Sequence, residues 1–375
     1  MLWASEMTRR SLYLNWYVRV PKLKYDLRSS GISGFKYDLS VSDFNLSHNY
    51  AHGSPEASAL LAERYHVLPE NVFSASEGAT GQNTRVIRYI AEKYPNRKEA
   101  VVEYPTYEPL LRAVQDYFPV VKRLERKDED GYRLDAERLR KVVSKETALC
   151  LITNSHAPSG AIADALELKE IMAVADEFEF FVVCDEIYAE FNRDVVPTAF
   201  SVDSEFGIVT TSFTKAYGLG GLRAGVALAN KAVVDDLYED ALNTVGTASN
   251  LVEAVTVKLL TEGKQALERH KEKWMRLKRE TEKLLDEKRF RYLKNDAGVT
   301  YWVQLPVKDT YKWVDDYTIP EQSLAVVPGA FFLFRDDYEF AKSNMVRLGI
   351  GYINPDDSNL AEAFEVLEKA VRTAK

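Results

Sequence analysis

Short apolar runs alternate with amphipathic segments through the middle of the chain. Residues 100–103, 148–153 and 180–184 are mostly apolar, as in strands that are buried on both faces of a parallel sheet. Between the last two runs, residues 164–179 repeat apolar side chains at helical spacing on one face. Strands that alternate with helices over about 170 residues predict a doubly wound, mostly parallel α/β sheet.

The chain after residue 250 has a different character. Residues 251–290 are helical in pattern and heavily charged, which predicts a long helix with a solvated face. Beyond this helix, strand-like segments and turns are followed by a closing helix, which is typical of an α+β unit. The expected strands are residues 299–305, 324–327 and 344–350, and the expected closing helix is residues 357–373.

The first 50 residues are rich in aromatic side chains and show no clean period beyond a possible short helix over residues 10–18. So many aromatic residues without a core of their own predict a segment that packs on the rest of the chain or on a partner subunit. A chain of 375 residues is long for a single core. We therefore predict a large α/β domain over residues 46–250 and a smaller α+β domain built from residues 1–45 and 251–375.

Composition and charge argue against several classes of protein. The hydrophobic content of 46% is ordinary for a soluble protein, and the net charge of −8 does not suit a general nucleic-acid binder. No apolar run approaches membrane-spanning length, and the first residues lack the features of a signal peptide. Cys150 and Cys184 lie in apolar runs and are expected to be buried free thiols, with neither a disulfide nor a metal site. We expect a cytoplasmic protein that binds neither nucleic acid nor membrane.

One lysine stands at the end of an apolar strand-like run. Lys215 follows the run 207–211 and is surrounded by hydroxyls and glycines. A charged ammonium is costly in such a place, and one reason to keep a lysine there is an imine to a carbonyl cofactor. Pyridoxal phosphate (PLP) fits, because its sites need a lysine, a carboxylate at the pyridine nitrogen and donors for a phosphate. Ser212 and Thr214 offer hydroxyls, and Arg223 offers a planar fork for the phosphate. A glycine-rich turn with a solvated lysine is the alternative interpretation.

Other polar groups follow strand ends in the same domain. Two of them are the acidic pair after residue 184 and the loop 104–107 after residue 103. Residues 72–81 predict a short strand and a small-residue loop that leads into a helix. Ligands of doubly wound sheets bind at the carboxyl ends of the strands. Backbone amides at a helix start form an anion site, although a plain strand-to-helix turn explains the same loop. Together with Lys215, these positions predict one site at this edge of the sheet.

The motifs form an ordered string along the chain. They are Glu77-Gly78-Ala79-Thr80, Tyr104-Pro105-Thr106-Tyr107, Asn154-Ser155-His156-Ala157-Pro158-Ser159-Gly160, Asp185-Glu186-Ile187-Tyr188, the segment 212–225, Val327-Pro328-Gly329 and Arg347. In this order and spacing the chain resembles the fold-type I PLP-dependent aminotransferases of class I/II, over nearly its whole length. The resemblance implies PLP as the cofactor and a homodimer with shared active sites.

The resemblance also assigns roles at the cofactor. Lys215 would hold PLP as a Schiff base and then move the proton between the substrate Cα and the cofactor. Asp185 would keep the pyridine nitrogen of the cofactor protonated, and Tyr107 would stack on the cofactor ring. Tyr188 would form a hydrogen bond with the phenolic oxygen of the cofactor. The other implied cofactor-binding residues are Gly78, Ala79, Asn154, Ser212, Arg223 and, from a partner subunit, Tyr50.

Substrate binding is implied for three further residues. Arg347 resembles the arginine that clamps the substrate α-carboxylate, although taken alone it is better explained as a salt-bridged strand arginine. Ser30 and Gly31 are assigned to the loop that covers the same carboxylate. The chain departs from the family at Ala157, where an asparagine usually contacts the phenolic oxygen of the cofactor. That contact is missing, or Asn154, His156 or water replaces it.

Four functions are compatible with these residues. The resemblance favours an aminotransferase that moves an amino group between an L-amino acid and a 2-oxo acid, with aspartate-like, alanine-like and aromatic substrates all open. Ala157 and the aromatic N-terminal segment keep a PLP-dependent lyase or amino-acid synthase of the same fold open. A non-catalytic PLP-binding regulator is disfavoured, because no helix-turn-helix motif is attached. A dinucleotide loop at residues 218–221 is weak, because it lacks the G-x-G-x-x-G spacing.

Overall fold

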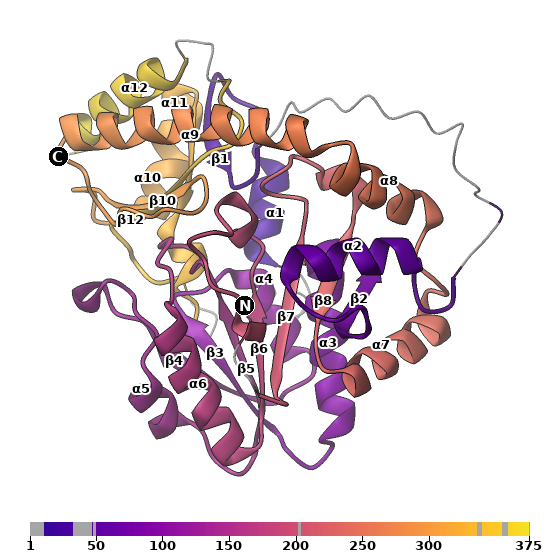
Figure 1. Ribbon diagram of the computed structural model, residues 1–375. Helices are drawn as coiled ribbons and strands as arrows, with labels where there is room; N and C mark the ends of the chain where they lie inside the picture. The colour runs from indigo at the N-terminus through magenta and orange to yellow at the C-terminus, as the bar shows by residue number, and fades with distance from the viewer. Residues whose placement is uncertain are drawn as a thin grey trace.

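Two sheets organise the chain. A computed structural model describes residues 11–32, 47, 50–201, 204–335, 340–354 and 359–374. Figure 1 shows the larger sheet in the lower half of the molecule and the smaller sheet in the upper left. The larger sheet comes from the middle of the chain and the smaller one from both ends, in agreement with the predicted α/β and α+β parts. The residue limits of the two domains stay a prediction.

Seven strands form the larger sheet, and most of them are parallel. They are β2 (Val72–Ala75), β3 (Glu99–Tyr104), β4 (Val120–Glu125), β5 (Thr147–Thr153), β6 (Phe181–Asp185), β7 (Gly207–Ser212) and β8 (Gly225–Leu228). Their order is β2-β8-β7-β6-β5-β3-β4. The pairings from β7 to β4 are parallel, whereas β8 runs antiparallel to both β7 and β2. The predicted mostly parallel sheet is therefore confirmed.

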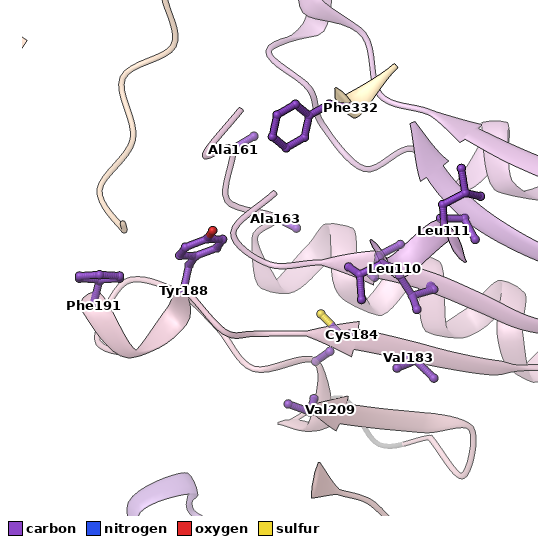
Figure 2. Packing of buried hydrophobic residues seen from close by; sticks show 14 of the residues in the cluster. Leu110, Leu111, Ala161, Ala163, Val183, Cys184, Tyr188, Phe191, Val209 and Phe332 are labelled. Carbon is purple, nitrogen blue, oxygen red and sulfur yellow. The ribbon is translucent and has the colours of Figure 1, made fainter. Parts of the chain in front are cut away.

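The central strands are buried on both faces, as their apolar runs predict. Every residue of β5 and of β6 is buried. Figure 2 shows Val183 and Cys184 of β6 and Val209 of β7 among the packed side chains of this core. Cys150 and Cys184 are buried free thiols, as expected.

Helices pack on this sheet and connect its strands. They are α2 (Pro55–Tyr65), α3 (Gly78–Lys93), α4 (Glu108–Gln115), α5 (Ala136–Val142), α6 (Ala165–Phe178) and α7 (Lys231–Thr244). α3 packs across β5, β6, β7 and β8, and its first residue, Gly78, lies against Gly225, the first residue of β8. α2 begins where the Ser54 side chain accepts a hydrogen bond from Ala57 N, and Pro55 occupies the first turn, where a missing N–H costs nothing.

The smaller sheet joins a strand near the start of the chain to strands near its end. They are β1 (Tyr25–Ser29), β9 (Arg291–Tyr292), β10 (Thr300–Gln304), β11 (Leu324–Pro328) and β12 (Met345–Ile350). β1 lies parallel to β11 and β12, and β10 lies antiparallel to β12. The sequence predicted no regular element in the first 50 residues beyond the short helix, so β1 was not expected. Its five residues carry no clear alternation, and the partners that make it a strand lie far along the chain.

The helices of the second half of the chain correct another expectation. They are α8 (Asn250–Thr261), α9 (Lys264–Glu287), α10 (Thr310–Trp313), α11 (Ile319–Gln322) and α12 (Asn359–Thr373). The single helix expected over residues 251–290 is in fact α8 followed by α9. The break falls at Gly263, where a Cβ atom would lie 2.5 Å from the carbonyl oxygen of Leu259. The backbone of Leu259, four residues earlier in the chain, leaves no room for a Cβ there.

Short turns complete the described elements. The 3-10 turns are η1 (Pro69–Asn71), η2 (Asp128–Asp130), η3 (Ala189–Phe191), η4 (Ala199–Ser201), η5 (Gly220–Leu222) and η7 (Gly329–Phe332), and η6 (Val314–Thr318) is a π-helical turn. Among all helices of the described residues, none has the length and apolar character needed to cross a lipid bilayer.

The aromatic N-terminal segment packs on the body of the same chain in its described part. The short helix expected over residues 10–18 is α1 (Leu12–Arg19). Tyr13 and Trp16 are its buried residues, and the Trp16 ring lies 5.3 Å from the ring of Phe331. Of the two surfaces that the sequence left open, α1 therefore covers its own subunit.

Candidate active site

The carboxyl ends of the parallel strands meet at one edge of the larger sheet. β3, β5, β6 and β7 are parallel neighbours, so the residues that follow them lie along a common line. Asp185 at the end of β6 pairs in register with Thr210 of β7, two residues before Ser212 ends that strand. The topology therefore brings the acidic residue and the lysine loop together, as the sequence predicts.

Asp185 is a buried carboxylate that accepts two hydrogen bonds. Asn83 Nδ2 donates to Oδ2 over 2.7 Å, and the Ile187 backbone N donates to Oδ1 over 2.9 Å. Burial raises the pKa of Asp185 to about 6, against the lowering effect of Asn83, Ile187 and Lys215. No ion pair joins it to a lysine or arginine of the described residues. A buried carboxylate of this kind suits a protonated ring nitrogen.

Lys215 follows β7 with its side chain partly covered. Its Nζ donates a hydrogen bond to Ser30 Oγ over 2.9 Å. Desolvation by burial lowers the pKa of the amine, and the cations Arg347 and Arg223 lower it further, whereas Tyr13 and Asp185 raise it. A lowered pKa increases the share of the neutral amine, which is the nucleophilic form needed to bind a carbonyl.

An anion cradle lies at the start of α3. The helix begins with no side-chain hydrogen bond to its first turn, which leaves backbone donors there for a ligand. Arg223 is exposed, and its Nη2 donates to the Glu77 carbonyl over 3.0 Å. Gly78 N in turn donates to the Arg223 carbonyl over 2.7 Å. Gly78 has φ of +67°, and a Cβ there would lie 2.6 Å from Arg223 Nη2, so any other residue would have to displace the guanidinium.

Hydroxyl groups border this cradle. Ser212 pairs in register with Gly225, and a Cβ on Gly225 would lie 2.7 Å from the Gly78 carbonyl oxygen. The end of β7 is thus close to the start of α3. Ser212 Oγ and Thr214 Oγ1 share a hydrogen bond of 2.6 Å, and Ser212 Oγ also accepts from Thr214 N. Ala79, in the first turn of α3, is buried.

Arg347 lies in β12 of the smaller sheet and is 2% exposed. Its Nη2 donates to Tyr13 Oη over 2.9 Å and to the Arg28 carbonyl over 2.8 Å, and its buried Nε has no partner. Within the described residues, no carboxylate forms an ion pair with it. The salt-bridged strand arginine that the sequence alone favoured is therefore not what the described residues show. A buried guanidinium with no carboxylate partner in the described part of the chain suits an anionic ligand.

The loop after β1 packs on the lysine. The Ile32 backbone N donates to the Lys215 carbonyl over 3.0 Å, and a Cβ on Gly31 would lie 3.0 Å from Lys215 Cδ. Ser30 bonds the amine, and Arg28 bonds Arg347 with its carbonyl group. The predicted substrate-binding residues Ser30 and Gly31 therefore contact the lysine, and the same segment contacts the arginine through Arg28.

The two predicted cofactor-contacting tyrosines are close to these groups. Tyr188 is buried beyond the end of β6, as Figure 2 shows, and its pKa is raised mainly by that burial and lowered by Arg347 and by a hydrogen bond with Ser30. Tyr107 stands immediately before α4, and burial likewise raises its pKa. The Tyr107 ring lies edge-on to Tyr13, with the ring centroids 5.2 Å apart.

The geometry at Asn154 favours a structural role over the predicted cofactor contact. Its Nδ2 donates to the carbonyls of Ala163 and Pro197, and its Oδ1 accepts from Ala163 N. His156 is also occupied, because its two ring nitrogens meet Ser159 Oγ and the Pro105 carbonyl. Neither side chain is thus free to replace the asparagine that the family usually has at Ala157.

Tyr50 lies before α2 with its side chain 37% exposed. Its predicted role concerns a site in a partner subunit, which a single chain does not test. Its assignment stays a prediction.

Sequence reasoning missed three residues of this site. Asn83 and Thr210 form a relay in which Thr210 Oγ1 donates to Asn83 Oδ1 and Asn83 donates to Asp185. A buried asparagine beside Val86, Ile87 and Ile90 on α3 is the signal that was available. Tyr13 of α1 is the third, and no local pattern relates it to Arg347.

The residues present fit PLP. The start of α3 with Arg223 suits the phosphate, Asp185 suits the pyridine nitrogen, and Lys215 suits the carbonyl carbon. The burial of Asp185, which has no ion-pair partner among the described residues, and the glycine at Gly78 in the cradle are independent signs of this fit.

Comparison with known proteins supports the same interpretation. The family model "Aminotransferase class I and II" matches residues 39–367. The chain is 24% identical over 257 residues to an aspartate aminotransferase of Pyrococcus abyssi, covering 66% of this chain and 63% of that relative. It is 24% identical over 300 residues to aromatic-amino-acid aminotransferase 2 of Thermococcus litoralis, covering 78% and 72%.

A solved structure shows a similar fold. A PLP-dependent aminotransferase from Streptococcus suis superposes with a TM-score of 0.81 at 23% sequence identity, over 98% of each chain. The matched part of the chain spans less than two thirds of the length of the Pyrococcus relative.

Proposed function

The chain belongs to the aminotransferase class I and II family, and from this premise we propose that it is a PLP-dependent aminotransferase. The observation that carries the proposal is that the segment around β1 contacts two basic groups. One is the partly covered Lys215 amine with its lowered pKa, which bonds Ser30, and the other is the buried Arg347 guanidinium, which bonds the Arg28 carbonyl and has no carboxylate partner among the described residues. The first suits a carbonyl cofactor and the second suits the carboxylate of an amino acid.

Each of these residues would act on a particular part of the cofactor or of the substrate. Asp185 would hold a proton on the pyridine nitrogen, and Arg223 with the first turn of α3 would bind the phosphate. PLP supplies an electron sink that stabilises negative charge at the substrate Cα. Lys215 Nζ would remove the Cα proton as a neutral amine and return it, for which its lowered pKa is suited.

Arg347 would orient the amino acid or 2-oxo acid by its α-carboxylate. Arg347 is 2% exposed, so little water competes for its hydrogen bonds. Its hydrogen bonds to a carboxylate are therefore stronger than they would be in water. The substrates that we propose are an L-amino acid and a 2-oxo acid, which exchange one amino group.

The domain limits and the assembly belong to the same proposal. We assign residues 46–250 to the cofactor-binding domain, and residues 1–45 with 251–375 to the smaller domain, which agrees with the origin of the two sheets. We also propose a cytoplasmic location and a homodimer. The exposed Tyr50 before α2 supports the dimer, in which it would reach the phosphate site of the partner subunit. A monomeric mass by light scattering would contradict the dimer.

A PLP-dependent lyase or amino-acid synthase is the second candidate. It is favoured by Ala157, whose methyl group cannot donate a hydrogen bond, and by the engagement of Asn154 and His156 with other groups. Without the asparagine donor at position 157, the phenolic oxygen of the cofactor would carry a different charge distribution.

One measurement separates the two. The visible absorbance of the PLP-loaded protein is recorded after adding each common amino acid and then a 2-oxo acid. Loss of the cofactor band with one amino acid and its return with a 2-oxo acid is expected for an aminotransferase. A band that no 2-oxo acid restores, with release of a modified carbon skeleton, supports the second candidate and contradicts the first.

A further inference from the structure

The N-terminal helix α1 places one tyrosine on the arginine of the site. Tyr13 is 4% exposed, and its hydroxyl oxygen accepts a hydrogen bond from Arg347 Nη2 over 2.9 Å. The guanidinium carbon of Arg347 lies 5.6 Å from the centroid of the Tyr13 ring. The contact joins residues near opposite ends of the chain, so it exists only in the folded molecule.

The helix that carries Tyr13 is fastened at both ends. The buried carboxylate of Glu108 accepts from the backbone N of Leu12 over 3.2 Å and of Tyr13 over 3.4 Å, and Ser11 Oγ also bonds it. A negatively charged side chain at the N-terminus of a helix stabilises that helix through its dipole. At the other end, Asp315 accepts from Trp16 Nε1 over 3.2 Å. These contacts fix the position of the Tyr13 hydroxyl against Arg347.

The Tyr13 hydroxyl keeps its proton when it bonds Arg347. The hydroxyl oxygen is the acceptor in its bond with Arg347, because arginine can only donate. Its own O–H is therefore a donor.

Aromatic rings surround the same position. The ring of Tyr13 lies 5.2 Å from Tyr107, 5.7 Å from Phe331 and 6.0 Å from Phe332 between centroids. Arg347 Cζ lies 5.4 Å from the centroid of Phe332. An apolar surround strengthens a hydrogen bond to a charged ligand.

We propose that Tyr13 is a substrate-binding residue, whose hydroxyl donates a hydrogen bond to the carboxylate that Arg347 binds. This inference rests on the proposed function for the identity of the substrate, but it concerns carboxylate binding and not amino transfer. The N-terminal helix thereby forms part of the active site, and the carboxylate receives donors from the first and the last parts of the described chain.

The test measures equilibrium binding of carboxylates that do not react. Maleate and 3-phenylpropanoate are titrated into the PLP-loaded protein, with calorimetry as the readout, for the wild type, Tyr13→Phe and Tyr17→Phe. Tyr13→Phe keeps the ring and removes the donor, so we expect affinity for at least one probe to fall about five- to twentyfold. PLP affinity should be unchanged. Tyr17→Phe, on the same helix but with its hydroxyl bonded to Tyr352 Oη, should bind like the wild type.

The binding test separates a failure of the inference about Tyr13 from a failure of the proposed aminotransferase function. Equal or tighter binding by Tyr13→Phe would overturn the inference, because the hydroxyl would then be a spectator or a competitor for Arg347. A wild type that binds neither probe would overturn it as well. Weaker binding in Tyr13→Phe together with no amino transfer in the wild type would remove the aminotransferase proposal and leave the inference standing. Melting temperatures of the three proteins check that the helix stays docked.

Discussion

Asn83 Nδ2 donates a hydrogen bond to Asp185 Oδ2 over 2.7 Å, across 102 residues of sequence. The bond joins the first part of α3 to the end of β6, and Thr210 of β7 orients the amide by donating to its oxygen. A burial-raised pKa of about 6 means that Asp185 depends on such donors to remain ionised near neutral pH.

Removal of the Asn83 amide should weaken cofactor binding. Asn83→Ala takes one donor from the Asp185 carboxylate, so the pKa of that carboxyl rises further and less of it is ionised at pH 7. We expect the PLP dissociation constant to rise about tenfold at pH 7, and more steeply than in the wild type as the pH falls. Fluorescence titration with PLP at several pH values measures this. Thr84→Ala on the same helix is the control, and equal pH dependence in Asn83→Ala and the wild type would refute the role.

The burial of Asp185 also predicts a pH dependence of stability without cofactor. Its pKa is about 6 when folded and near the usual 3.8 when unfolded, so the unfolded chain loses this proton first as the pH rises. The contribution is fully present below the unfolded pKa and is lost as the pH rises through about 6. Relative to Asp185→Asn, which does not titrate, the cofactor-free wild type should lose about 1 kcal/mol of unfolding free energy between pH 5 and 8.

Urea unfolding of the two cofactor-free proteins across this pH range provides the measurement. The absolute stabilities differ for other reasons, because an asparagine amide would meet the donors of Asn83 and Ile187. Only the change of their difference with pH tests the prediction. A constant difference would show that Asp185 is not desolvated in the folded protein.

Gly78 is the residue on which the anion cradle depends. Gly78→Ala places a methyl group 2.6 Å from Arg223 Nη2 and must displace the guanidinium. We expect PLP and inorganic phosphate to bind about tenfold more weakly or worse, since a charged hydrogen bond is lost. Gly131→Ala is a matched control, because Gly131 also has a positive φ, of +72°, but has nothing within 4 Å of the added Cβ. Equal effects of the two variants on PLP binding would mean that backbone strain, and not the cradle, is responsible.

Lys215 should be the covalent anchor of the cofactor. Lys215→Ala removes the amine that bonds Ser30 and should leave the fold intact. Borohydride reduction of the PLP-treated protein, followed by mass spectrometry, should find no covalent cofactor in this variant. Lys231→Ala on the exposed side of α7 is the control and should be labelled as the wild type is. A labelled Lys215→Ala protein would place the anchor on another lysine.

Arg347 should bind the substrate far more than the cofactor. Arg347→Gln removes the charge and the planar fork, and charged hydrogen bonds contribute about 1.5–3 kcal/mol. The KM for the amino acid should therefore rise about 10- to 100-fold, with PLP affinity nearly unchanged. Arg335→Gln, at an exposed arginine that pairs with Glu125, is the control. An unchanged KM in Arg347→Gln would remove this residue from the substrate site.

Local pattern was sufficient for most elements of the larger sheet. Runs such as those of β5 and β6 are apolar throughout because both faces of the strand are covered, and this is visible in the sequence itself. β8 was missed because its four residues follow a motif loop and are defined by pairing with β2 and β7. β1 was missed for the same reason in the smaller sheet, since its partners β11 and β12 lie near the other end of the chain.

The residues of the candidate site likewise fall into those that local sequence predicts and those that only long-range contacts bring together. The sequence by itself determined the chemistry: a lysine after β7, an acidic residue after β6 and a glycine at the start of α3, because each follows from its own strand or helix end. Only the tertiary structure decided which groups meet, namely Asn83 with Asp185, Ser30 with Lys215 and Tyr13 with Arg347. These contacts span 102, 185 and 334 residues, and no periodicity or local preference encodes a distance between side chains so far apart in the chain.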